Sequence, residues 1–186
     1  TNLNRSISKL RTNSNFEAVV KTKYGQQGPG EVLMYLLVNG AKLAGQGQGG
    51  DLRVNNRMYE IKGAKKNKDD QYVDFNLGGT VAESDIISRI FLLGMKEKII
   101  TTQSRTEFNS TNMKQLRASD SNDDLIALEQ LYAKRAYKYL SKYDMMFIST
   151  AAKTYGTILE VCNVPAARIQ IERISQGRIR PAISCP

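Results

Sequence analysis

Two acidic residues and a lysine lie at the spacing of a short β-hairpin. Asp51 is followed by Glu60 and Lys62, with Asn55 and Asn56 midway between the two acids. Asparagine tolerates positive φ better than most residues, so the Asn-Asn pair is expected to form a two-residue turn. Counting outward from that turn places Asp51 directly opposite Glu60 on the neighbouring strand. The sequence therefore predicts two facing carboxylates.

Such a pair is unfavourable unless a cation lies between the carboxylates, which points to a divalent metal ion. Because side chains alternate along a strand, Lys62 is expected on the same face as Asp51 and Glu60. Its ammonium could hold an attacking water and stabilise charge developing on a phosphate. A bound Mg²⁺ would polarise a phosphoryl oxygen and lower the pKa of water. The opposite face carries apolar side chains for core packing, namely Leu52, Val54, Tyr59 and Ile61.

The order of an acidic residue, a short hairpin and Glu-x-Lys resembles the PD-(D/E)XK nuclease superfamily, and the resemblance is best from Asp51 to Lys62. It implies that Asp51 and Glu60 bind the metal and that Lys62 assists hydrolysis. A glutamate on the preceding helix often joins such sites, so Glu31 is a further candidate metal ligand. Taken alone, Glu31 suits the first turn of a helix, where the dipole favours an acidic residue, better than it suits a metal site. Gly50 stands where the family name has proline.

The resemblance implies an Mg²⁺-dependent endonuclease, with Mn²⁺ as a substitute metal, that hydrolyses DNA phosphodiester bonds as restriction and bacteriophage enzymes do. By analogy with enzymes that cut duplexes, a homodimer is expected. The alternative is a nucleic-acid-binding or phage structural and assembly protein that retains a nuclease-like fold without catalysis. A further alternative is that Asp51 caps a turn and that Glu60 and Lys62 form a solvated surface pair.

The charge of the chain favours a polyanionic partner. Lysine and arginine number 27 against 18 aspartate and glutamate residues, for a net charge of +9, and a basic protein attracts nucleic acid. Lys65, Lys66 and Lys68 follow the hairpin directly and are candidates for phosphate contacts, although a solvated charge run is the alternative. The glycine-rich run from Gly45 to Gly50 lacks the Lys-Ser/Thr ending of a phosphate-binding loop, so no nucleotide cofactor is expected.

Composition limits the protein class and the kind of metal site. With 186 residues, of which 41% are hydrophobic, the chain is expected to fold as a single domain over 1–186. No histidine and only two cysteines are present, which excludes a zinc site of Cys and His ligands and leaves oxygen ligands. Sparse cysteines favour reduced thiols, although a disulfide is an alternative. No apolar run suits a membrane span or signal core, so we expect a soluble protein in the cytoplasm, or in the host cytoplasm if from a phage.

The hydrophobic pattern predicts a mixed α/β (α+β) fold, namely a restriction-endonuclease-like mixed sheet flanked by helices, with extra C-terminal strands. Residues 1–28 are expected to be a loosely ordered or short helical lead-in, and residues 101–121 a polar surface insertion. The first long helix is expected from Glu31 to Leu43, which leaves no room for a strand before the acidic hairpin. The remaining expected elements are a strand at Gln71–Leu77, helices at Val81–Lys98 and Asp123–Leu140, strands at 145–149 and 156–161, and a hairpin over 167–183 that turns at Gln176-Gly177.

Overall fold

The computed structural model describes residues 2–16, 18, 28–44, 50–78, 81–101, 106–163 and 167–186. Helices and strands intermix along the chain, which confirms the predicted α+β fold class. The chain divides into two compact units. Unit 1 comprises Thr1–Lys65 and Leu140–Ala166 with Pro186, and unit 2 comprises Lys66–Tyr139 and Ala167–Cys185. The expectation of one domain over 1–186 stays a prediction.

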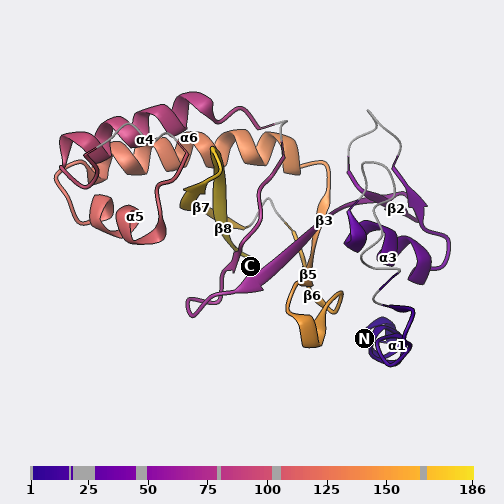
Figure 1. The fold of residues 1–186 in the computed structure, drawn as a ribbon. Helices are drawn as coiled ribbons and strands as arrows, with labels where there is room; N and C mark the ends of the chain where they lie inside the picture. Colours follow the sequence, from indigo (N-terminus) through magenta and orange to yellow (C-terminus); the bar gives the residue numbers. More distant parts are fainter. Residues whose placement is uncertain are drawn as a thin grey trace. The chain divides into compact units, whose positions relative to one another are not determined.

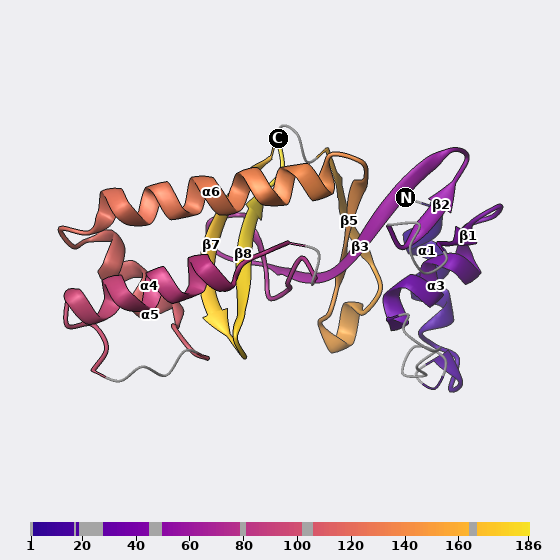
Figure 2. The same ribbon diagram turned by 90° about the horizontal axis from the view of Figure 1, so that it is seen from above.

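Unit 1 is built on a mixed sheet, whose strands run in the order β1-β2-β3-β5-β6. β3 and β5 are parallel, and the other neighbouring pairs are antiparallel. Figure 1 shows β2, β3, β5 and β6 with the helices α1 and α3, and Figure 2 shows β1 beside β2. The elements are α1 (Asn2–Leu10), α3 (Pro29–Leu37), β1 (Lys42–Leu43), β2 (Leu52–Val54), β3 (Arg57–Lys66), β5 (Asp144–Ser149), the 3-10 helix η1 (Ala152–Thr154) and β6 (Ile158–Cys162).

The hairpin between β2 and β3 has the predicted register. Asn55 and Asn56 both adopt positive φ, at 46° and 67°, as a tight two-residue hairpin turn requires. The Cα partners are Val54 with Arg57, Arg53 with Met58 and Leu52 with Tyr59. The pairing expected from the sequence is thus confirmed over the three residues of β2.

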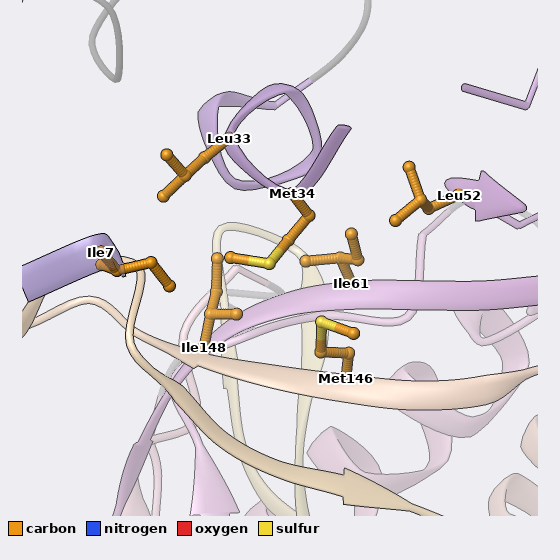
Figure 3. Close-up of a cluster of buried hydrophobic side chains, with 7 residues drawn as sticks. All are labelled: Ile7, Leu33, Met34, Leu52, Ile61, Met146 and Ile148. Carbon is orange, nitrogen blue, oxygen red and sulfur yellow. The ribbon is translucent and has the colours of Figure 1, made fainter. Parts of the chain in front are cut away.

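One face of the sheet packs against the helices of unit 1. Figure 3 shows Met34 of α3 pointing between Ile61 of β3 and Ile148 of β5. The close approach depends on Gly30, because a Cβ at that position would lie 2.3 Å from Cδ1 of Ile148. The buried cluster consists of Ile7, Leu33, Met34, Leu52, Ile61, Met146 and Ile148, with Val54 and Tyr59 packed against it. The apolar face predicted for the hairpin is therefore confirmed.

The helix predicted from Glu31 to Leu43 is shorter than expected. α3 ends at Leu37, the following Val38 is extended, and Gly40 has a φ of 74°, a conformation that glycine adopts without strain. The chain then forms β1, whose Lys42 and Leu43 pair with Arg53 and Leu52 of β2. The expectation that no strand precedes the hairpin is wrong, because the glycine releases the chain early enough to form one.

Unit 2 contains a second sheet, in which β8 lies between β4 and β7. Gln176 and Gly177 turn the β7–β8 hairpin with positive φ, as predicted, and α6 confirms the helix expected at Asp123–Leu140. Figures 1 and 2 both show α4 running alongside α6. The elements are β4 (Tyr72–Val73), α4 (Ser84–Lys96), α5 (Ser110–Arg117), α6 (Asn122–Leu140), β7 (Arg168–Ser175) and β8 (Arg178–Ser184).

The segment 101–121 is not simply a surface insertion. It contains α5, whose Met113 and Leu116 are fully buried, and Phe108, which is also buried and forms a β-bridge with Ile174. The abundance of Ser, Thr and Asn concealed these apolar positions at helical spacing. Residues 102–105 lie outside the described residues. The expectation of a polar loop throughout 101–121 is therefore wrong.

Other predicted boundaries also shift. The lead-in contains the helix α1, whose Ile7 is buried in the core. The strand expected at 71–77 shortens to β4, and Asp74, with a φ of 72°, follows it directly.

Neither Cys162 nor Cys185 carries a free thiol, so the expectation of reduced cysteines is wrong. No helix among the described residues is long and apolar enough to cross a lipid bilayer.

Candidate active site

β3 carries the Glu-x-Lys pair at the predicted positions. The strand alternates, so Ile61 enters the core while its neighbours Glu60 and Lys62 point to the other face. Nζ of Lys62 lies 2.7 Å from Oε1 of Glu60, and their side chains are only 19% and 4% exposed. A lysine and a glutamate so little exposed form a buried ion pair. The alternative of a solvated surface pair is therefore wrong.

Asp51 is fixed against β3 by backbone hydrogen bonds. Its N–H donates to the carbonyl of Tyr59 at 2.8 Å, although Tyr59 is already the pairing partner of Leu52, so the regular ladder is not continued to an Asp51–Glu60 pair. The backbone N–H of Ile61 donates to Oδ2 of Asp51 at 2.7 Å. The carboxylate is thereby held beside the strand that carries Glu60 and Lys62.

The residue before Asp51 has a backbone conformation that proline cannot adopt. Gly50 has a φ of 72°, whereas proline is locked near −65°. A Cβ at Gly50 would also lie 3.1 Å from the ring of Tyr143 and 3.2 Å from Cε of Met58. This local backbone therefore requires glycine where the family name has proline.

Glu31 lies in the first turn of α3. The Pro29-Gly30 pair begins this helix, and Gly30 lets its N-terminus approach β3 and β5. Coulombic interactions couple Glu31 to Asp51, Glu60 and Lys62. The structure thus brings the four predicted site residues into one electrostatic cluster.

Two carboxyl groups of this cluster, those of Glu31 and Asp51, have raised pKa values. Burial raises the pKa of Glu31 to about 7, with a further contribution from the charge of Asp51 and partial offsets from a Gly28 hydrogen bond and Lys62. Burial and then the charge of Glu60 raise the pKa of Asp51 to about 6, while Lys62 and the Ile61 hydrogen bond oppose the shift. Negative charge exceeds positive charge here, so a further cation would relieve the repulsion.

Lys62 stays protonated in this environment. Burial alone would lower the pKa of its ammonium, but the charge and hydrogen bond of Glu60, followed by the charges of Asp51 and Glu31, outweigh burial and raise the pKa. Lys62 is therefore a fixed positive charge at neutral pH and is poorly suited to act as a general base.

The donor set suits a hard divalent cation. Mg²⁺ prefers oxygen ligands and is commonly bound by one or two carboxylates together with water and substrate phosphates. Asp51 and Glu60 supply two carboxylates with a mutual repulsion that a cation would relieve. Within the described residues, no three His, Cys, Asp or Glu side chains form a ready-made metal cluster. The arrangement fits a metal held by two carboxylates and completed by water and phosphate.

The three lysines expected to contact phosphate differ in their surroundings. Lys65, Lys66 and Lys68 are all exposed. Nζ of Lys66 lies 2.7 Å from Oδ1 of Asp70 and 5.1 Å from the centre of the Tyr72 ring. Lys68 lines a cavity in unit 2.

The same cavity includes residues that sequence reasoning missed, because segment 101–121 was expected to be a loop. Ser110, Lys114 and Arg117 line it from α5. The helical spacing of the buried Met113 and Leu116 is the signal that could have revealed this helix.

The geometry stands without support from relatives. No protein-family model, no curated protein and no solved structure matches this chain.

Proposed function

We propose that this chain is an Mg²⁺-dependent endonuclease that hydrolyses DNA phosphodiester bonds inside a cell. The observation that carries the proposal is the buried Glu60–Lys62 pair, to which Asp51 is electrostatically coupled across a hairpin of defined register. Two further observations support the resemblance to PD-(D/E)XK nucleases. β1 supplies a strand between α3 and the acidic hairpin, and Glu31 lies on α3.

Within this proposal, Asp51 and Glu60 hold Mg²⁺ through carboxylate oxygens. When bound, the ion supplies charge to a phosphoryl oxygen and lowers the pKa of a water ligand. The backbone hydrogen bond from Ile61 orients Asp51, so the carboxylate is positioned before the metal arrives. Such preorganisation reduces the cost of assembling the site.

Lys62 acts as an electrostatic residue. Its ammonium is held 2.7 Å from Glu60, where it can donate a hydrogen bond to a phosphate oxygen or to the attacking water. Hydrolysis joins the water oxygen to phosphorus, breaks the bond to the leaving oxygen and increases negative charge on the phosphoryl group. A fixed cation stabilises that charge.

Cleavage of supercoiled plasmid in Mg²⁺, Mn²⁺ or EDTA tests the proposal. Glu60→Gln removes a metal ligand, and Lys62→Met removes the charge while keeping the length of the side chain. Each variant is expected to lower the cleavage rate by about 100-fold or more, as for removal of one electrostatic donor from an active site. Asp144→Asn is the matched control, because Asp144 lies on the neighbouring strand and pairs loosely with Arg57 at 3.9 Å. Cleavage in EDTA, or wild-type rates in both site variants, would contradict the proposal.

A protein that binds nucleic acid without cutting it is the second candidate. It is favoured by the absence of a preformed three-ligand metal cluster among the described residues and by the net charge of +9. DNA binding that needs no metal, combined with no cleavage by the wild-type chain in Mg²⁺ or Mn²⁺, would establish this candidate.

A symmetric homodimer remains part of the nuclease proposal, because two sites related by a twofold axis can cut both strands.

A further inference from the structure

Unit 2 contains a polar cavity that the proposed active site does not use. Its volume is about 360 Å³, which is within the range of small-molecule sites. The buried residues Ile171 and Ala182, from β7 and β8, are its apolar lining. Polar residues line it from three segments, namely the 67–71 loop, α5 and β7.

The unpaired charges at this cavity are mainly positive. Lys68 and Lys114 are exposed, and neither belongs to an ion pair among the described residues. The carboxylate of Glu172 accepts a hydrogen bond from Ser110 and lies 3.2 Å from Nη1 of Arg173. Arg173 also lies 3.0 Å from Asp74, so it offsets only part of the charge of Glu172. The exposed charged side chains that line the cavity are those of Lys68, Lys114 and Asp69.

Arg117 is rigidly held at the edge of the same cavity. Its Nη2 donates to Oε1 of Glu129 and to the carbonyl of Ile171, both at 2.6 Å. Glu129 also accepts a hydrogen bond from the backbone N–H of Ile171 at 2.9 Å. This network fixes α5 and α6 to β7, so Lys114 projects from a helix that is anchored.

A relay of amide side chains orients a further donor. Nδ2 of Asn67 donates to Oε1 of Gln71 at 3.2 Å, and Nε2 of Gln71 donates to Oε1 of Gln170 at 3.1 Å. Because the oxygen of Gln170 is used as an acceptor, its NH₂ group is left to donate. The cavity thus combines two ammonium groups with an oriented amide donor.

We propose that this cavity binds a phosphate group of a nucleic-acid backbone and gives unit 2 its own contact with the strand. Ammonium and amide N–H groups are the usual protein donors to phosphate oxygens, and the volume leaves room for a phosphate with its attached sugar. The inference rests on the proposed function only in taking nucleic acid as the ligand, because it does not require hydrolysis. In this proposal, Lys114 and Gln170 contact the same phosphate group as Lys68.

Binding of a fluorescein-labelled DNA oligonucleotide to the full chain tests this inference. Fluorescence anisotropy in EDTA excludes cleavage, so the result does not depend on catalysis. The variant Lys68→Ala/Lys114→Ala is compared with Lys9→Ala/Lys153→Ala, which removes two exposed lysines of unit 1. The cavity variant is expected to weaken binding by about tenfold and to reduce the slope of log K against log salt by about 2. The control is expected to change affinity by less than about twofold.

Gln170→Leu separates a built site from a general charge effect. It keeps the net charge, so it is expected to weaken binding several-fold without changing the salt slope. Equal affinity losses in the cavity variant and the lysine control, or an unchanged affinity in Gln170→Leu, would overturn the inference.

Competition distinguishes the two sources of a phosphate group. Inorganic phosphate and a deoxynucleoside monophosphate are titrated into the wild-type complex with DNA. Weak displacement, at millimolar concentrations, is expected for a site that takes one phosphate of a longer strand. Tight binding of the mononucleotide that the cavity variant loses, with DNA affinity unchanged in that variant, would identify a free-nucleotide site and contradict the inference. If the wild-type protein binds DNA but does not cleave plasmid in Mg²⁺ or Mn²⁺, the nuclease proposal fails and the phosphate-binding proposal does not.

Discussion

The two units each bury a glutamate, and they compensate its charge in different ways. In unit 1, Glu60 pairs with Lys62, while Asp51 and Glu31 add further negative charge. In unit 2, Glu83 is 7% exposed, and its Oε1 lies 2.6 Å from Nε of Arg178. No second carboxylate raises its pKa there.

The causes of the raised pKa values of the buried carboxyl groups differ between the two units. In unit 2, burial raises the pKa of Glu83, and Arg178, an Ile179 hydrogen bond and Arg180 all oppose that shift. In unit 1, neighbouring carboxylates add to the effect of burial on Asp51 and Glu31. The glutamate in unit 2 is therefore compensated by arginines, whereas in unit 1 the single ammonium group of Lys62 is coupled to three carboxyl groups. An excess of negative charge is a property of sites that bind metal ions.

Removal of the compensating arginine in unit 2 should give the largest effect on stability. Arg178→Met leaves the buried carboxylate of Glu83 without its ion-pair partner. A broken buried pair costs about 3 to 5 kcal/mol. Because the Arg178 side chain is 36% exposed and Arg180 lies nearby, we expect about 2 kcal/mol by urea unfolding. Addition of Mg²⁺ should not restore the lost free energy of unfolding. A change below about 0.5 kcal/mol would show that Arg178 does not compensate Glu83.

A buried hydroxyl beside Glu83 provides the next test. Tyr132 is fully buried, and its hydroxyl has no hydrogen-bond partner among the described residues. Burial, and then the charge of Glu83, raise the pKa of this hydroxyl. Tyr132→Phe should therefore stabilise the protein by about 1 kcal/mol in thermal or urea unfolding, because a buried unsatisfied group is removed.

The matched control for that variant is Tyr137→Phe on the same helix. The hydroxyl of Tyr137 donates to the carbonyl of Ala167, so its removal should cost about 1 kcal/mol. Destabilisation by both variants to the same extent would indicate that Tyr132 has a partner in solution.

In unit 1, neutralising one carboxylate should stabilise the metal-free protein. Asp51→Asn keeps an oxygen that can accept the hydrogen bond from Ile61 and removes repulsion with Glu60. We expect a gain of up to about 1 kcal/mol in EDTA, the scale of like-charge pairs across strands. Asp144→Asn should give no gain, because Asp144 faces a cation, Arg57. Destabilisation of the Asp51→Asn protein in EDTA would contradict the charge imbalance.

The pH dependence of stability should also reveal the unit 1 cluster. Folding raises the pKa of Asp51 from 3.8 to about 6 and that of Glu31 from 4.5 to about 7. Between about pH 4 and pH 7 the folded state therefore binds more protons than the unfolded state, and this contribution to stability falls as pH rises. Urea unfolding in EDTA should show a less negative slope against pH in an Asp51→Asn/Glu31→Gln variant than in wild type. Equal slopes would show that these groups titrate normally.

The acidic hairpin could be predicted because its geometry is local. Two asparagines that tolerate positive φ set the register, and the alternation of side chains then assigns Ile61 to the core and Glu60 to the opposite face. Fold class followed from the same patterns.

Other features depended on contacts distant in sequence. Phe108 pairs with Ile174, and α5 packs against β7, but the polar composition of this segment hides its buried residues. β1 forms because it pairs with β2. A strand of two residues is too short to show a recognisable pattern in the sequence. The ion pair between Glu83 and Arg178 joins segments nearly a hundred residues apart, and the sequence carries no local signal for it.

Titration calorimetry of Mn²⁺ into the metal-free protein tests most directly whether the acidic hairpin binds a metal. Wild type and Asp144→Asn are expected to bind a single Mn²⁺ per chain with similar affinity. Asp51→Asn and Glu60→Gln should each lose that binding or weaken it by at least about tenfold. Mutation of residues that only support the ligands of a metal site already lowers metal affinity by about 10- to 100-fold. Unchanged Mn²⁺ binding in both site variants, or no binding by the wild type with or without DNA, would contradict the account.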